Sequence, residues 1–72
     1  MATFGGRIKE LRIRLNKKQT EIAEYLDLNP RTLRLYESNQ HEPSIESIIK
    51  LADFFDVSTD YLLGRSNNPK RQ

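Results

Sequence analysis

QTEIAEYLDLNPRTLRLYES, which runs from Gln19 to Ser38, carries the strongest structural signal in this chain. Its apolar residues recur at helical spacing on both sides of a polar break, as Ile22, Ala23 and Leu26 before it and as Leu33 and Tyr36 after it. The break contains Asp27, a residue type that tolerates the left-handed backbone conformation needed to reverse a helix. The stretch therefore predicts two short helices joined by a tight turn.

The second of these helices has a well-defined start. Asn29 is a residue type that caps helix N-termini, and Pro30 suits the first helical position, where its missing N–H costs nothing. Ala23 is small at the point where the two helices must approach each other closely. Helices arranged in this way form a helix-turn-helix, whose second helix is narrow enough to enter the major groove of DNA.

These residues, together with four further segments, resemble the helix-turn-helix of the lambdoid phage repressor and Cro superfamily, also called the XRE-type regulators. The resemblance covers roughly residues 4 to 64 and is carried by RIKELR (Arg7 to Arg12), QTEIAEYL (Gln19 to Leu26), TLRLYE (Thr32 to Glu37), EPSIESIIKLADFF (Glu42 to Phe55) and VSTDYLLG (Val57 to Gly64). It implies an all-α fold, a compact five-helix lambda-repressor-like DNA-binding domain over residues 1–64 in which helices 2 and 3 form the motif.

Capping residues place the ends of the other three helices. Thr3 can cap the first helix, and Asn16 can end it in the left-handed conformation. Pro43 and Ser44 open the fourth helix, and Ser58 caps a short fifth one. We expect core stripes on the first and fourth helices at Phe4, Ile8, Leu11 and Leu15, and at Ile45, Ile48, Ile49, Ala52 and Phe55.

Composition limits the remaining possibilities. The chain has 72 residues, which suit one domain with a small core, and it has no Cys and one His. A glycine-rich phosphate loop and a metal-spaced cluster of carboxylates are also missing, so we expect no enzyme activity, no cofactor and no metal site. No apolar run approaches the ~20 residues of a membrane span, and we expect a cytoplasmic protein. Residues 65–72 lack apolar side chains and are predicted to be a disordered polar tail or linker.

Charge is distributed unevenly along the chain. Residues 1–36 hold eight Lys or Arg and four acidic residues, whereas residues 37–64 hold one Lys and six acidic residues. This layout favours a protein that presents its N-terminal half to a polyanion, although ordinary solvated helix faces would give the same pattern.

The third helix would read DNA through the side chains outside its apolar stripe. Arg31, in the first turn, can donate two parallel hydrogen bonds to a guanine. Arg34, one turn later, can reach a base or a phosphate. Pro30 and Leu35 offer at most apolar contact to a thymine methyl group, and Leu35 is equally interpretable as a partly exposed core residue.

Backbone contacts are expected around this helix. The resemblance implies that Gln19 bonds to a phosphate, and Thr20 adds a hydroxyl donor at the same helix N-terminus. The family usually has an apolar residue and a Ser or Thr cap where this chain has Lys17 and Lys18, which we expect to contact phosphates instead. The full set of predicted DNA-binding residues is Lys17, Lys18, Gln19, Thr20, Asn29, Pro30, Arg31, Thr32, Arg34, Leu35, Asn39 and Gln40.

Two further features follow from the resemblance. The positions of Arg12 and Glu37 match a buried structural ion pair between the first helix and the end of the third. The region of the fifth helix makes the dimer contact in the family, which implies an exposed patch at Tyr61 and Leu62 with Arg65 at its edge.

We therefore expect a sequence-specific regulator of transcription that binds double-stranded DNA. Because one reading helix spans only a few base pairs, a homodimer on an inverted-repeat operator is expected, with helix 3 in the major groove. Repression is favoured over activation, since a compact domain without a sensor can act by occupying a promoter. The alternative is a protein-binding module on the same scaffold, antitoxin-like or a partner of another regulator. A further C-terminal domain in a longer regulator also remains open.

Overall fold

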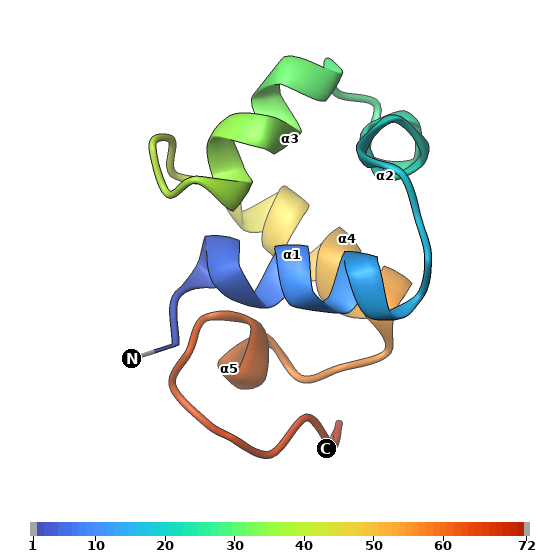
Figure 1. Cartoon of the computed structure of the whole chain (residues 1–72). Coiled ribbons are helices and arrows are strands. Elements are labelled where there is room, and N and C mark those ends of the chain that lie inside the picture. The colour runs from blue at the N-terminus through green and yellow to red at the C-terminus, as the bar shows by residue number, and fades with distance from the viewer. Residues whose placement is uncertain (1, 72) are drawn as a thin grey trace.

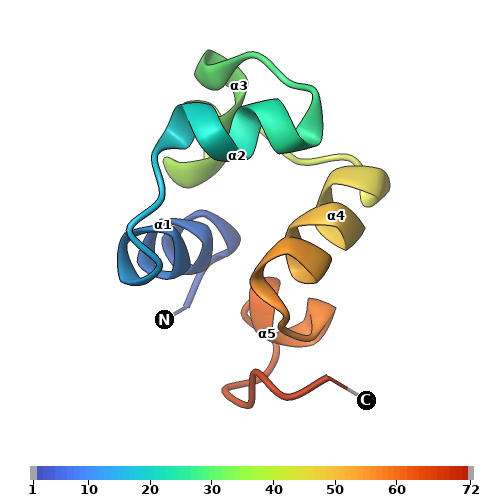
Figure 2. The same ribbon diagram turned by 90° about the vertical axis from the view of Figure 1, so that its right-hand side faces the viewer.

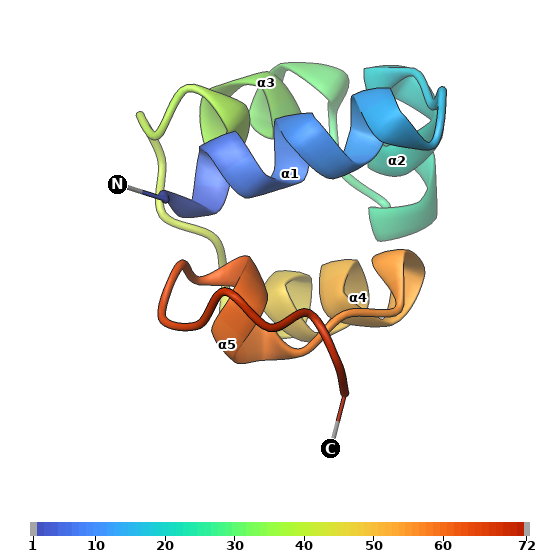
Figure 3. The same cartoon turned by 60° about the horizontal axis from the view of Figure 1, so that its bottom comes forward.

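The computed structural model describes residues 2–71, and it contains five helices and no strand in that range (Figure 1). The helices are α1 (Phe4–Arg14), α2 (Gln19–Leu26), α3 (Pro30–Glu37), α4 (Ile45–Phe55) and α5 (Thr59–Leu62). Figure 3 shows α1, α2 and α3 on one side of the molecule and α4 and α5 on the other. The predicted all-α, five-helix architecture is confirmed. No helix in the described range is long and apolar enough to cross a membrane.

Local capping chemistry sets the helix boundaries. The side-chain oxygens of Thr3, Asn29 and Ser58 each accept a backbone N–H from the first turn of the helix that follows. Asn16 and Asp27 adopt the predicted left-handed conformation, with φ of 56° and 57°. Lys18 precedes α2 without offering a side-chain acceptor, and the Glu21 carboxylate compensates by accepting the Lys18 N–H at 3.0 Å.

All five helices contribute to one apolar core. The five largest of the completely buried side chains each come from a different helix: Ile8, Ile22, Leu33, Leu51 and Leu62. The core therefore closes only when every helix is in place, as expected for a domain of this size without disulfides.

Two predicted core stripes are partly wrong. Leu15 is 48% exposed because it follows the last residue of α1 and no longer continues the helical face. Ile45 and Ile49 are 77% and 50% exposed, while Leu51, which the prediction missed, is completely buried. Ile45 and Ile49 lie four residues apart on one face of α4, and this face is turned away from the core; the first turn of α4 projects at one side of the molecule (Figure 2).

The C-terminal residues 65–71 lie against the rest of the fold, which differs from the disordered tail expected from composition (Figure 3). The Pro69 carbonyl accepts the Ser58 N–H at 3.0 Å. Asn67 accepts a hydrogen bond from Arg7, whose guanidinium stacks 3.8 Å above the Tyr61 ring. Arg71 pairs with Asp53, and this hydrogen bond raises the pKa of Arg71. Gln72, the last residue of the predicted tail, lies outside the described residues.

α1 and α3 approach each other so closely that only glycine fits at one point. A Cβ atom on Gly5 would collide with the Tyr36 carbonyl oxygen and lie 2.5 Å from that of Glu37. Asn39, in the left-handed conformation with φ of 60°, fastens the same end. Its amide accepts the Gly5 N–H at 3.0 Å and donates to the Thr3 hydroxyl at 3.1 Å.

The other end of α1 forms the predicted ion pair with the same C-terminal end of α3. Arg12 donates to both carboxylate oxygens of Glu37, at 2.7 and 3.1 Å. Gln19 donates to the same carboxylate at 3.0 Å. The side chains of Arg12 and Glu37 are 15% and 5% exposed, so the pair is largely removed from water. One carboxylate thus connects α1, α2 and α3.

The close contact at Gly5 predicts that two neighbouring glycines differ strongly in how well they tolerate substitution by alanine. Gly5→Ala should lower the free energy of unfolding by about 2 kcal/mol, because the added methyl group pushes α1 away from the backbone of α3. Gly6→Ala is the matched control, since its Cβ would meet only the Thr3 hydroxyl, at 3.0 Å, and should change stability by less than about 1 kcal/mol. Urea unfolding of both variants measures the difference, and equal effects would rule out the steric explanation.

The buried ion pair predicts that two carboxylates differ in how much they contribute to the stability of the domain. Glu37→Gln should destabilise the domain by about 3 kcal/mol, because it leaves the Arg12 charge desolvated without a counter-ion. Glu10→Gln is the control: it removes a pair with Arg14 whose side chains are 55% and 64% exposed, and should cost less than about 0.5 kcal/mol. Guanidinium unfolding curves would contradict the prediction if the two variants had the same midpoint.

Candidate nucleic-acid interface

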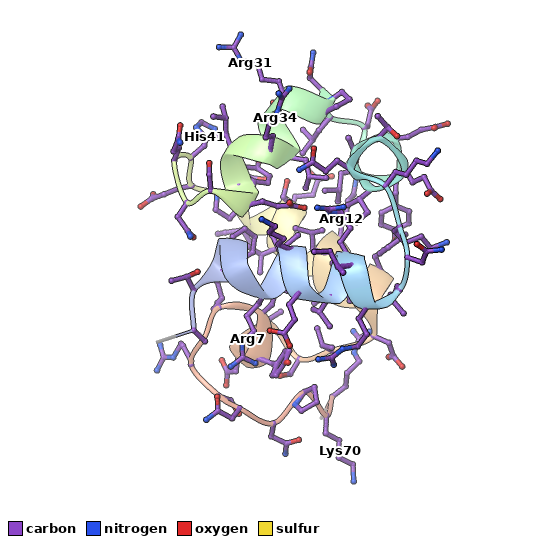
Figure 4. The ribbon with its side chains drawn as sticks, in the orientation of Figure 1. Arg7, Arg12, Arg31, Arg34, His41 and Lys70 are labelled. Carbon is purple, nitrogen blue, oxygen red and sulfur yellow. The ribbon has the colours of Figure 1, made fainter. Side chains whose placement is uncertain are left out.

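The N-terminal part of α3 exposes two positively charged side chains to solvent. Asn29 caps the helix by accepting the Arg31 N–H at 2.8 Å, which fixes the direction in which α3 begins. Arg31 and Arg34 are both exposed. Figure 4 shows both guanidinium groups on the α3 side of the molecule, with Arg31 extending furthest outward and Lys70 at the opposite end.

The other residues predicted on α3 are less accessible. Pro30 is exposed at the first position of the helix, whereas Thr32 and Leu35 are half-buried. Leu35 is only partly exposed, so both interpretations of this residue remain compatible with the structure. Among the exposed side chains of the first two turns, only the arginines can form hydrogen bonds.

The N-terminus of α2 lies beside this surface. Lys17, Lys18 and Thr20 are exposed, and Lys17 lies 3.9 Å from the Glu21 carboxylate. Gln19 is half-buried, because its amide donates to Glu37. Its second amide N–H is the one that could reach a ligand, so Gln19 is held in place by the protein before any contact is made.

The loop after α3 exposes both of its predicted residues, Asn39 and Gln40, but the side chain of one of them is already hydrogen-bonded within the protein. Gln40 is exposed, but the Asn39 amide is directed toward Gly5 and Thr3 at the start of α1. The exposed Asn39 side chain therefore already forms one intramolecular hydrogen bond through its oxygen and one through its nitrogen. His41 stacks on Tyr36 with ring centroids 5.7 Å apart.

The expectation of an exposed patch at Tyr61 and Leu62 is wrong. The two residues are 8% and 0% exposed, because α5 has only four residues and turns both of them into the core. Arg65 is exposed, and its role stays a prediction. The exposed apolar side chains of this half of the chain are instead Ile45, Ile49 and Leu63.

A polar groove of about 260 Å³ runs between α1 and α3. It is lined by Lys9, Arg12, Gln19, Arg34, Glu37 and Ser38. Sequence reasoning missed Lys9. The signal was present, since Lys9 lies three residues before Arg12 and therefore shares its face of α1. Within residues 2–71 no group of acidic or histidine side chains is arranged to hold a metal ion.

Known proteins similar to this chain are regulators of transcription. The chain is 36% identical over 69 residues to the HTH-type transcriptional regulator ImmR of Bacillus subtilis, which covers 96% of this chain and 54% of ImmR. It is 32% identical over 59 residues to the cryptic phage CTXphi transcriptional repressor RstR of Vibrio cholerae, with 82% of this chain and 53% of RstR covered. The chain thus spans about half the length of these curated relatives.

The same fold occurs in a solved repressor structure. A crystal structure of the P22 c2 repressor in complex with a synthetic operator superposes with a TM-score of 0.85, at 24% sequence identity. The match covers 92% of this chain and 100% of that one. Residues 8–62, more than half of the chain, match the helix-turn-helix family. The chain therefore belongs to the helix-turn-helix family.

Proposed function

We propose that this chain is a repressor that binds an inverted-repeat operator as a homodimer in the cytoplasm, with the start of α3 in the major groove of each half-site. The observation that carries the proposal is the exposed Arg31, projecting from the capped N-terminus of α3 at the far end of the molecule from Lys70 (Figure 4). A guanidinium there can form two parallel hydrogen bonds with the O6 and N7 atoms of a guanine.

The surroundings of Arg31 support this use. Arg31 forms no ion pair with a carboxylate among residues 2–71, so its charge is available to a ligand. Lys17, Lys18 and Thr20 at the start of α2, and Gln40 after α3, are exposed and can contact the phosphates on either side of the groove. Repression is supported by RstR, whose name describes a transcriptional repressor.

A dimer follows from the size of the reading element. The eight residues of α3 form a helix about 12 Å long, which can contact only a few base pairs. Two copies, with their α3 helices about 34 Å apart on one face of the duplex, double that contact. Ile45 and Ile49 lie one turn apart on α4 and remain uncovered in the single chain. We assign this pair to the contact between the two copies, in place of the buried Tyr61 and Leu62.

Removal of the Arg31 side chain should change which sequence is bound. In binding-site selection from a random duplex pool, Arg31→Ala should lose the preference for one guanine in each half-site, a discrimination of about 1–3 kcal/mol. Lys70→Ala, which removes one charge at the opposite end of the molecule, should select the same sequence as the unmodified chain. An unchanged guanine preference in Arg31→Ala would exclude direct base contact by this residue.

If Ile45 lies in the dimer contact, its substitution should weaken binding to a full inverted repeat but not to a single half-site. Ile45→Asp should lower the affinity for a full inverted repeat toward that for a single half-site, because a desolvated carboxylate disfavours the apolar contact. Affinity for an isolated half-site should stay unchanged. Ile13→Asp is the control on α1, at a side chain that is 60% exposed. Sedimentation with both DNA lengths measures the ratio, and an equal loss in the two variants would place the contact elsewhere.

The protein-binding alternative has its own signature. Binding driven by an apolar protein partner would depend little on salt, whereas DNA binding should weaken by about 0.9 log units per log unit of salt for each phosphate neutralised.

A further inference from the structure

The groove between α1 and α3 contains two positively charged side chains that form no ion pair within residues 2–71. Of its four charged side chains, Arg12 and Glu37 neutralise each other through two hydrogen bonds. Lys9 on α1 and Arg34 on α3 are exposed, and neither forms an ion pair with a carboxylate of the described residues. The groove is therefore a site with a net excess of two cations.

The other polar groups of the α1–α3 groove already have hydrogen-bond partners, and the groove is large enough for an anion. The Ser38 hydroxyl is occupied, since it donates to the Leu35 carbonyl at 3.2 Å. Both oxygens of Glu37 have partners, because Gln19 adds a third hydrogen bond at 3.0 Å to those from Arg12. A volume of about 260 Å³ is large enough for a phosphate group together with some water.

The position of the groove relative to the reading helix defines what could fill it. Arg34 lies three residues after Arg31 and therefore one turn along the same helix. Gln19, which also lines the groove, is the first residue of α2, where unpaired N–H groups and the helix dipole favour negative charge. If the start of α3 enters the major groove of DNA, the sugar–phosphate backbone at the edge of that major groove passes along the side of α3 that faces α1.

We propose that the α1–α3 groove binds one backbone phosphate of each operator half-site, held between Lys9 and Arg34. This inference rests on the proposed DNA binding and adds a residue, Lys9, and a shared site to it. A phosphate held from two helices at once sets how far α3 enters the major groove, and it does so independently of base sequence. Arg34 is thereby assigned to the phosphate and not to a base.

The salt dependence of operator binding tests the contribution of each cation. Lys9→Ala and Arg34→Ala should each weaken binding about fivefold, as expected for loss of one solvent-accessible charge pair, and reduce the slope of log affinity against log salt by about 0.9. The selected base sequence should stay the same in both variants. Lys70→Ala is the control with the same change of net charge, and a loss as large as that of Lys9→Ala would overturn the proposal.

Single methylphosphonate substitutions in the operator test whether the two cations share one phosphate. At one position in each half-site the neutral linkage should weaken binding of the unmodified chain. At that same position it should have little further effect on either Lys9→Ala or Arg34→Ala. Separate positions for the two variants, or no such position for Lys9→Ala, would refute the shared site.

These outcomes separate the proposal from the function on which it rests. An unmodified chain that binds the operator while Lys9→Ala binds equally well would leave the DNA-binding function intact and exclude the phosphate site. An unmodified chain without affinity for any duplex would refute both.

Discussion

The arrangement of the first three helices depends on one buried carboxylate, that of Glu37. It lies at the end of α3 and accepts hydrogen bonds from Arg12 on α1 and from Gln19 on α2. Burying a charge is unfavourable unless it is paired and hydrogen-bonded, and here both oxygens have partners. Apolar packing is non-directional, whereas hydrogen bonds constrain angles as well as distances. This carboxylate therefore fixes the orientation of the three helices more narrowly than the core alone would.

Such a contact forms only if the helices can come close enough, and a glycine at the start of α1 and an asparagine after α3 permit it. Gly5 lets the backbone of α1 approach the backbone of α3, where any side chain would collide. Asn39 then ties the loop after α3 to the start of α1 through its side-chain amide. The C-terminal end of α3 is thus held by directional contacts from both ends of α1. Side chains that must meet a ligand within a fraction of an ångström need this kind of rigid support.

The sequence predicted best the features that depend on neighbouring residues along the chain. Thr3, Asn29 and Asp27 act at helix ends through local backbone chemistry, and each does what its residue type indicates. The resemblance to a known family supplied the pairing of Arg12 with Glu37, a contact between residues 25 apart that no local pattern indicates.

The prediction was weakest where burial depends on distant partners. α5 is too short for an apolar period to show which of Tyr61 and Leu62 faces inward, and both do. The tail packs because Arg71 meets Asp53 and because the Pro69 carbonyl meets the N–H of Ser58. The composition of the tail alone carries no information about these partners. Local patterns fix helix ends, but only the assembled core decides which helix faces remain exposed.

In the proposed complex the three arginines have different roles, and this limits how many of them can read bases. Arg12 is committed to the fold and Arg34 to the phosphate, which leaves Arg31 as the hydrogen-bonding group at the tip of α3. One bidentate contact discriminates by about 1–3 kcal/mol, less than the 4–10 kcal/mol that typically separates specific from non-specific DNA binding. Pro30 can add only apolar contact. The remainder must come from the second copy and from DNA sequences whose shape lets the phosphates reach their sites at low deformation energy. In such a protein the base contacts read the sequence directly, and the ease with which the DNA deforms adds to the selection.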